Sequence, residues 1–247
     1  MEQEMSDTQS QVEFRSDVDV KLVRAAAQDS DVVWAARVST AGEESIDAVG
    51  SDASDSAFLI KYLARERHGS PFEHNSMTFM VTAPIFVFRE FMRHRVGFSY
   101  NEESGRYREL KSVFYVPGPE RRLVQEGRPG RYNFVEGTQE QYEIVVKQTR
   151  HAAEVAYGAY QEMLEAGVAR EVARGVLPVG IYSTMYVTCN ARSLMSFLSL
   201  RTKNENSKFP SYPQREIEMV AEQMEEHFAK LMPITYEAFQ ASGRVSP

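Results

Sequence analysis

The sequence predicts an α+β fold in which helices pack on a mixed or antiparallel sheet. Segments with apolar residues at helical spacing and segments with β-branched or alternating apolar residues follow one another irregularly along the chain. A parallel α/β sheet would instead require a regular alternation of strand and helix, which this order lacks. The length of 247 residues and the hydrophobic content of 43% are sufficient for a sizeable core.

The N-terminal half begins with a polar, acidic stretch, and we expect a disordered tail over residues 1–16 with a single domain over 17–247. The elements expected next, each marked by its apolar period and its bounding cap or turn residues, are a strand at 18–23, a helix near 31–38, a loop at 39–56, a helix at 55–69, a strand at 76–83 and a helix at 84–95. Asp55 with Ser56 and Gly69 are cap signals, and Pro84 suits a first helical turn.

The C-terminal half is interpreted in the same way. Its expected elements are a loop at 99–108, a short strand with a turn-rich segment at 111–122, a second loop at 126–138, a long amphipathic helix at 139–166, a short helix at 169–178, a strand at 181–189, a helix at 190–203 and a final amphipathic helix at 213–232. Pro178 ends the short helix. No internal repeat is visible in the sequence.

Charge is unevenly distributed along the chain. Residues 1–56 hold 13 acidic and 4 basic residues, whereas the remaining 191 hold 22 acidic and 24 basic ones. Of the 28 basic residues 21 are Arg, which suits bidentate contacts with phosphate or carboxylate, although genomic base composition produces the same skew. No long basic stripe is present, so we expect a small anionic ligand rather than a nucleic acid.

The N-terminus has neither the basic nor the apolar region of a secretory signal. No run approaches the roughly 18 apolar residues that a membrane helix needs. A single cysteine, Cys189, excludes an internal disulfide framework, and its place at the end of an apolar strand indicates a buried, inert thiol. We therefore expect a cytoplasmic protein without a membrane partner.

The densest polar stretch is "RHRVGFSYNEESGRYR", Arg93 to Arg108, which follows the apolar helix directly. A solvated basic patch neutralised by neighbouring carboxylates is the simplest interpretation. However, Ser104, Gly105 and Arg106 offer a hydroxyl, an approachable backbone N–H and a guanidinium together, which suits a phosphate group. Asn101 and Glu102 have side chains able to bind the edge of a base or a sugar.

Other candidates are weaker or ambiguous. His68 and His74 flank a Ser70-Pro71 turn, but their spacing matches no standard metal-ligand pattern, so no metal is expected.

In the helix at 190–203, Arg201 shares an apolar sector with Asn190, and a buried Arg needs an acceptor, either a core Glu or a ligand. For Arg174, a salt bridge to Glu171 and a ligand contact are both open. Neither GxGxxG nor a P-loop is present, so the residues alone indicate a non-Rossmann site for a nucleotide-like ligand.

The chain resembles the flavin-dependent thymidylate synthases. In that family RHR is followed by about seven residues and a Ser, and here eight residues separate RHR from Ser104. The flanking "SPFEH", "APIFVFREFMRHR", "SYNEESGRY", "AREVARGVLP" and "NARSLMSFLSLR" are similar too, in the same order. The resemblance implies an α+β homotetramer with shared active sites, FAD as cofactor, NADPH as reductant and methylenetetrahydrofolate as carbon donor for the conversion of dUMP to dTMP.

The resemblance also implies roles for individual residues. Arg201 matches the residue that activates the uracil ring, and no cysteine nucleophile is needed. The positions that match flavin contacts are Ser70, Arg93, His94, Arg95, Glu102, Asn190, Arg192 and Ser196. The positions that match nucleotide contacts are Glu90, Phe91, Met92, Arg93, Glu102, Glu103, Ser104, Gly105, Arg106, Arg174 and Arg201.

Three departures from the family pattern carry their own expectations. The extra residue before Ser104 predicts a small loop bulge. Glu90 stands where some members have Gln, and its charge needs Arg93 or Arg89 nearby. Ser196 stands where a larger His or Asn is frequent. The rival interpretations are a non-catalytic nucleotide- or flavin-binding regulator on the same fold, and an interaction module that uses the acidic residues 1–56.

Overall fold

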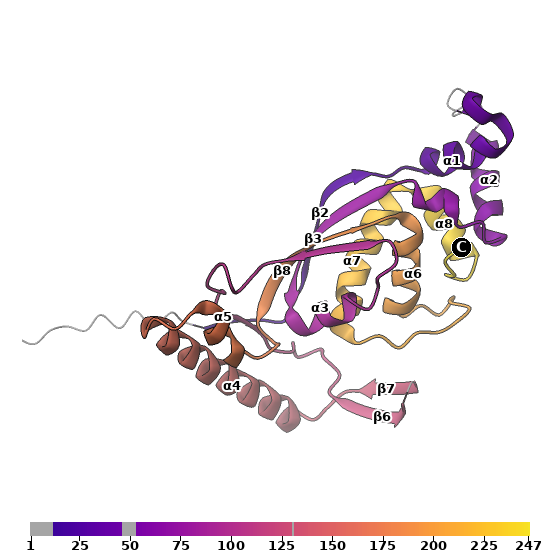
Figure 1. Cartoon of the computed structure of the whole chain (residues 1–247). Helices are drawn as coiled ribbons and strands as arrows, with labels where there is room; N and C mark the ends of the chain where they lie inside the picture. The colour runs from indigo at the N-terminus through magenta and orange to yellow at the C-terminus, as the bar shows by residue number, and fades with distance from the viewer. Residues whose placement is uncertain (1–11, 46–52, 130) are drawn as a thin grey trace, which may run out of the picture. The chain divides into compact units, whose positions relative to one another are not determined.

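The computed structural model describes residues 12–45, 53–129 and 131–247 (Figure 1). The chain divides into two compact units. One, which we call the α4 unit, comprises the residues up to Asp17, Ala83–Phe86 and Glu103–Ser183. The other, which we call the sheet unit, comprises Val18–Thr82, Val87–Glu102 and Thr184–Pro247. The single domain expected over residues 17–247 stays a prediction.

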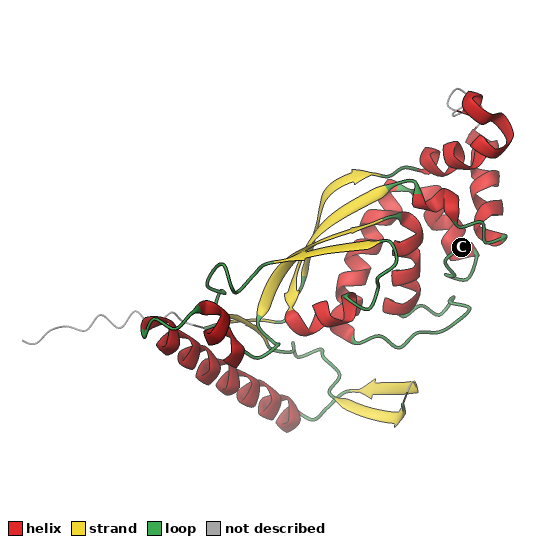
Figure 2. Cartoon of the chain, viewed as in Figure 1, coloured by secondary structure: helices red, strands yellow, loops and turns green. Residues whose placement is uncertain are grey.

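The sheet unit is built on a four-stranded sheet in the order β2–β3–β8–β4 (Figure 2). Its strands are β2 (Asp19–Ala26), β3 (Ser76–Pro84), β8 (Tyr182–Cys189) and β4 (Phe98–Glu102). β2 pairs antiparallel with β3, and β4 pairs antiparallel with β8. Between β3 and β8, hydroxyl hydrogen bonds join Thr78 to Thr188 and Thr82 to Thr184. Residue numbers rise along β3 as those of the partners in β8 fall, so this pair is antiparallel too.

Helices complete the sheet unit. They are α1 (Asp29–Ala41), the 3₁₀ helix η1 (Gly42–Ser45), α2 (Ala53–Arg65), the 3₁₀ helix η2 (Ser70–Glu73), α3 (Ile85–Phe91), α6 (Ala191–Arg201), α7 (Arg215–Leu231) and α8 (Pro233–Ala241). α7 packs against β2 and α6 through Ile217, Val220, Met224 and Phe228, which are buried and recur at helical spacing. This packing fixes α6, the helix that carries Arg192 and Arg201.

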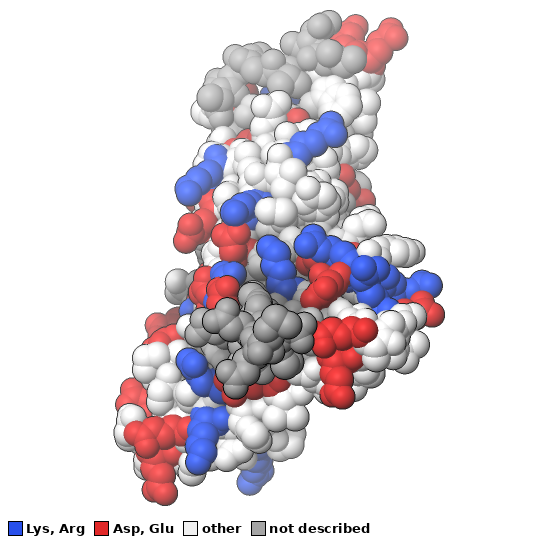
Figure 3. Space-filling view, turned by 90° about the vertical axis from the view of Figure 1, so that its left-hand side faces the viewer, with Lys and Arg blue, Asp and Glu red and all other residues white. Residues whose placement is uncertain are grey.

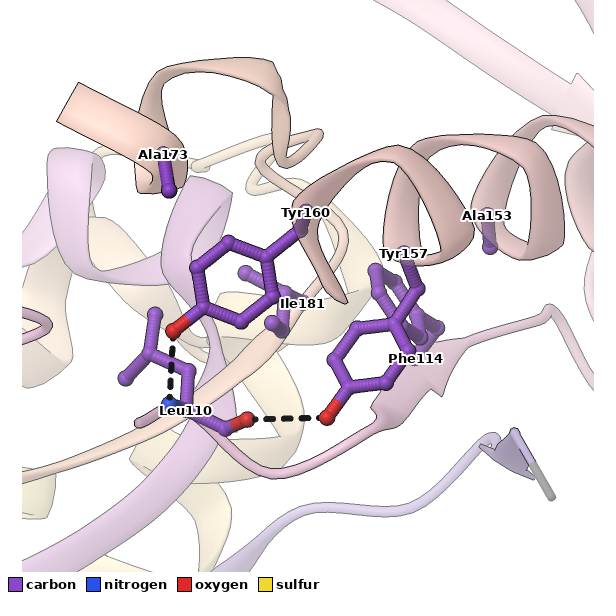
Figure 4. Close-up of a cluster of buried hydrophobic side chains, with 7 residues drawn as sticks. All are labelled: Leu110, Phe114, Ala153, Tyr157, Tyr160, Ala173 and Ile181. Atoms are coloured by element: carbon purple, nitrogen blue, oxygen red, sulfur yellow. Dashed lines mark hydrogen bonds between the residues drawn. The ribbon is translucent and has the colours of Figure 1, made fainter. Parts of the chain in front are cut away.

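The α4 unit is organised by one long helix. Its elements are β1 (Glu13–Arg15), β5 (Val113–Tyr115), β6 (Val124–Arg128), β7 (Arg131–Val135), α4 (Gln139–Glu165), α5 (Arg170–Ala173) and the 3₁₀ helix η3 (Arg174–Val176). Figure 4 shows Tyr157 and Tyr160 of α4 reaching the segment around Leu110. Tyr157 Oη donates to the Leu110 carbonyl at 3.3 Å, and the Leu110 amide donates to Tyr160 Oη at 3.4 Å. These bonds hold the chain that follows the Arg93–Arg108 motif.

The α+β prediction is confirmed, with antiparallel pairing in the main sheet. The strands expected at 76–83 and 181–189 and the helices expected at 139–166 and 190–203 are present within a few residues of their expected limits. The expected inert Cys189 is confirmed as well: its side chain is buried, and burial raises the pKa of its thiol. Periodicity thus located the long, strongly patterned elements.

Several expectations about loops and ends are wrong. Within the expected loop at 39–56, α1 continues to Ala41, η1 follows, and α2 begins at Ala53; residues 46–52 lie outside the described part. The expected loop at 99–108 begins as strand β4, and the loop at 126–138 contains most of the β6–β7 hairpin. The helix expected to reach residue 95 ends at Phe91, and α8 was not anticipated.

Residues 13–15, which the sequence placed in the disordered tail, form strand β1 and pair parallel with β5. Residues 1–11 of that tail lie outside the described part of the chain. Among the described residues no helix is both long and apolar enough to cross a membrane. On the face shown in Figure 3, basic and acidic side chains are interspersed rather than gathered by sign.

Candidate functional site

The centre of the candidate site in the sheet unit is Arg201, at the end of α6. Its Nη1 donates to the Glu90 carboxylate, its Nη2 to the Glu90 carbonyl at 3.3 Å, and its Nε to His94 Nε2 at 3.1 Å. The Arg201 and Glu90 side chains are 18% and 27% exposed, so the ion pair is largely removed from water. The sequence left a core Glu and a ligand open as acceptors for Arg201; the structure supplies Glu90, itself a predicted site residue. The sequence suggested Arg93 or Arg89 as the nearby charge for Glu90, whereas the ion-pair partner in the structure is Arg201.

His94 is held as a neutral imidazole. Burial, and then the charge of Arg201, lower the pKa of His94 to about 4. Because Nε2 accepts from Arg201, the remaining ring proton lies on Nδ1. The ring also packs edge-on against Phe197 of α6, with 4.9 Å between centroids. Near neutral pH His94 therefore acts as a hydrogen-bond acceptor that orients Arg201.

The turn that carries RHR is fixed by Tyr100 of β4. Its hydroxyl lies 2.8 Å from the Phe91 carbonyl and 2.7 Å from the His94 carbonyl, so its one proton is shared between the carbonyls on either side of Arg93. The Tyr100 ring stacks on Phe98, with 5.8 Å between centroids and 7° between planes. Burial raises the pKa of Tyr100, which keeps the hydroxyl protonated as a donor. Tyr100 was not among the residues singled out from the sequence.

The same turn approaches the first turn of α6 at Gly97. Gly97 has a φ of +69°, and a Cβ there would lie 2.0 Å from Ser193 Oγ. Asn190, the N-cap of α6, accepts from the Ser193 amide at 2.9 Å through its side-chain oxygen. The pairing of β4 with β8 shows no shift from Phe98 to Glu102, so the bulge expected from the extra residue is not in the strand.

A cavity of about 450 Å³ opens beside the first turns of α6. Two predicted flavin contacts, Arg192 and Ser196, line it, together with Arg67, Glu73, Val96, Ser193, Ser199, Val245, Ser246 and Pro247. Arg192 donates to the Glu73 carboxylate and, at 2.7 Å, to a backbone oxygen of Pro247. A Cβ on Gly69 would lie 2.4 Å from the Arg192 guanidinium carbon, so Gly69 allows this side chain to pass. Ser70, which follows Gly69, is exposed at the start of η2.

A second set of predicted residues lies within the α4 unit. Ser104 Oγ accepts from the Arg106 amide at 3.3 Å, and the Ser104 carbonyl accepts from the amides of Tyr107 and Arg108. Gly105 is buried, and a Cβ there would lie 3.1 Å from Leu110 and 3.2 Å from the Arg174 side chain. The buried contacts of Leu110 therefore support the turn on which Ser104 and Arg106 stand.

Glu171, the partner suggested for Arg174, pairs instead with Arg106 at 2.7 Å. Within the described residues the Arg174 guanidinium has neither a hydrogen bond nor an ion pair, and the same holds for Arg93 and Arg95. Glu103 pairs with Arg108 at 3.1 Å. Three exposed guanidinium groups are thus available to an anionic ligand.

The remaining predicted contact residues differ in how far their side chains are exposed to a ligand. Phe91 is fully buried and stacks on Phe197, so only its backbone could meet a ligand. Met92 is 40% exposed, and Glu102 lies exposed at the end of β4. The described residues contain no group of three His, Cys, Asp or Glu side chains placed to hold a metal ion.

A buried ion pair behind Arg201 was also missed by the sequence interpretation. Arg244 is 2% exposed and contacts Glu225 at 2.6 and 2.8 Å. It also donates to Thr202 Oγ1 at 2.6 Å, and Thr202 directly follows Arg201. No local pattern marks this arrangement, because Thr202, Glu225 and Arg244 lie in three separate segments of the chain. Its effect is to fix the end of α6.

The sequence and the fold were compared with protein families, known relatives and solved structures. The family model described as thymidylate synthase complementing protein matches residues 21–234. The flavin-dependent thymidylate synthases of Streptomyces avermitilis and Streptomyces coelicolor are 69% and 66% identical to the chain, each over at least 95% of both chains. The UMP/dUMP methylase PolB from Streptomyces cacaoi, solved with 5-Br dUMP, is similar with a TM-score of 0.90 at 58% identity, covering 96% of this chain and 100% of that one. Its structure with 5-Br UMP gives a TM-score of 0.88.

Proposed function

The chain belongs to the thymidylate synthase complementing protein family, the flavin-dependent thymidylate synthases, and from that premise we propose that it converts dUMP to dTMP. The carbon donor proposed is methylenetetrahydrofolate, the cofactor is FAD and the reductant is NADPH. The observation that carries the proposal is the identity of 66–69% with flavin-dependent thymidylate synthases over nearly the whole chain. A nucleotide of the proposed kind is bound by PolB, whose solved structures hold brominated dUMP and UMP.

We assign activation of the uracil ring to Arg201. The contacts to Glu90 and His94 use three of its five N–H groups, which leaves two for a ligand. A guanidinium held near the pyrimidine stabilises the negative charge that develops as the ring becomes a carbon nucleophile. Glu90 and His94 hold the group in advance, so little reorganisation is needed when the charge forms.

The residues of the sheet unit fit a flavin. The cavity beside α6 offers an arginine, several hydroxyls and the apolar Val96, which suits a ring system with polar edges and phosphates. We propose that Arg192, Ser196, Asn190 and Ser70 hold the cofactor there, with Arg93, His94, Arg95 and Glu102 contributing from the RHR segment. When bound, the flavin would carry the one-carbon group and supply the hydride, and these residues would bind and orient it. The buried Cys189 thiol is not required.

For the phosphate of the nucleotide we propose Ser104, Gly105, Arg106 and Arg174. The Arg174 guanidinium beside Gly105, which has no partner within the described part of the chain, is suited to a phosphate, since Arg binds such groups bidentately. Glu90 to Arg93, Glu102 and Glu103 complete the proposed nucleotide contacts. We also propose a cytoplasmic homotetramer with shared active sites, in which the two sets of residues need not come from the same copy.

Product formation tests the function. Purified protein is incubated with dUMP, FAD, NADPH and methylenetetrahydrofolate, and then with each component omitted, and dTMP is measured by chromatography. We expect dTMP only in the complete mixture, apart from the amount supported by carried-over flavin. Binding of dUMP and FAD without dTMP in the complete mixture would instead indicate a non-catalytic regulator.

Replacing Tyr100 by Phe is expected to lower kcat about five- to tenfold, because one hydrogen bond of roughly 1 kcal/mol fixes the turn that carries His94. The KM for dUMP should change little, since the Tyr100 hydroxyl binds the backbone of the turn and is not among the proposed nucleotide contacts. Tyr186→Phe is the matched control, because Tyr186 lies next to Tyr100's partner in β8 and is 50% exposed. Steady-state kinetics at saturating FAD measure both values, and an unchanged kcat for Tyr100→Phe would contradict the role of the turn.

A further inference from the structure

The chain leaves α2 through an arginine in a conformation that favours glycine. Arg67 has a φ of +61°, its amide donates to the Ala64 carbonyl at 3.3 Å, and the next amide, of His68, donates to the Leu63 carbonyl at 2.9 Å. These two bonds form a Schellman motif, whose left-handed position is usually glycine. After α4 the same motif carries Gly167, with a φ of +82°. Arg67 thus holds a strained backbone where the chain elsewhere uses glycine.

The side chain of Arg67 lines the cavity beside α6 that also holds Arg192. Within the described residues Arg67 has no side-chain hydrogen bond or ion pair. The charge of Arg192 is balanced by Glu73, whereas that of Arg67 is not. Among the described residues, Arg67 therefore brings a guanidinium without a paired acid to a cavity that four serines line, Ser193, Ser196, Ser199 and Ser246.

Residues held in the left-handed region cluster at binding and active sites. A guanidinium among hydroxyls, with a second guanidinium on the same cavity, is the donor set that phosphates and carboxylates prefer. We infer that Arg67 binds an oxyanion of the ligand in this cavity, and specifically the phosphates of the flavin dinucleotide. This inference rests on the proposed function, because Arg192 and Ser196 are proposed flavin contacts.

Arg67→Gly separates ligand binding from a structural role, because the substitution should stabilise the flavin-free protein and weaken FAD binding. The melting temperature of the flavin-free protein should rise by about 2–4 °C, because glycine adopts the left-handed conformation without strain. The dissociation constant for FAD should increase about tenfold or more, as expected for loss of a charged hydrogen bond. Fluorescence titration with FAD and thermal melting of the same flavin-free samples measure the two effects.

Two further variants sharpen the comparison. Arg67→Asn keeps a residue that tolerates the left-handed conformation but lacks the charge, so it should weaken FAD binding like Arg67→Gly. Arg65→Ala removes an exposed arginine that lies outside the cavity and pairs with Glu66, so it should leave FAD binding unchanged. Unchanged FAD affinity in both Arg67 variants would overturn the inference.

A rise in the KM for methylenetetrahydrofolate with unchanged FAD affinity would also overturn the flavin assignment and place folate carboxylates on Arg67. If the unmodified protein fails to bind FAD at all, the proposed function fails instead. The two failures are thus distinguishable in the same titration.

Discussion

Arg201→Ala is expected to lower kcat for dTMP formation by about 10²–10³-fold, the usual cost of removing one donor from a developing negative charge. FAD should remain bound, because the proposed cofactor contacts at the first turns of α6 do not include Arg201. The loss arises in the chemical step, since without the guanidinium the uracil ring has no group to stabilise its charge. Single-turnover kinetics with dUMP, and FAD content from the visible spectrum, measure the two quantities.

The variant also leaves the Glu90 carboxylate without its partner, which by itself lowers stability. Arg201→Ala combined with Glu90→Gln removes that unpaired charge, so it should recover stability but not turnover. Lys203→Ala, two residues along and exposed, is the matched control and should retain full activity. Near-normal turnover in Arg201→Ala would refute the assigned role.

Gly97→Ala is expected to destabilise the protein by about 2 kcal/mol or more. The left-handed backbone contributes roughly 1–2 kcal/mol, and the contact of the new Cβ with Ser193 Oγ adds an overpacking cost of similar size. Because Gly97 ends the turn that carries His94, activity at saturating ligands should fall as well. Urea unfolding of the purified variant measures the change in the free energy of unfolding.

A second substitution divides this cost into its two parts. Gly97→Ala with Ser193→Ala removes the clashing hydroxyl, so part of the lost stability should return while the backbone part remains. Gly158→Ala is the control, since a Cβ there meets nothing within 4 Å in the middle of α4; it should stabilise the helix by about 0.5–1 kcal/mol. Equal stability of Gly97→Ala and the original protein would contradict the close packing of the turn on α6.

The long elements were predictable because their patterns are local. α4 shows a helical period over 27 residues and a Thr138 cap, and β3 alternates buried and half-buried positions along its length. β4 was mistaken for a loop because its polar residues form a strand only through pairing with β8, far along the chain. α3 ends early for a similar reason: Tyr100 binds the carbonyl of Phe91, and no nearby signal announces that bond.

The candidate site was predictable in its residue types but not in its pairings. The apolar sector around Arg201 indicated a buried guanidinium that needs an acceptor, and the structure supplies Glu90. That pairing joins residues that lie 111 positions apart, so periodicity could not reveal it. Arg244 was missed for the same kind of reason, because it lies 42 positions from Thr202 and 19 from Glu225. For Gly97 and Arg67 the deciding property is the backbone conformation, which the residue type alone does not specify.

The visible absorption spectrum of the purified protein, recorded without oxygen before and after addition of NADPH, tests the proposed chemistry most directly. We expect the bands of a bound flavin, present on purification or after incubation with FAD, and their bleaching by NADPH as the cofactor is reduced. A protein that stays colourless after incubation with FAD, or a bound flavin that NADPH does not bleach, would contradict the proposal.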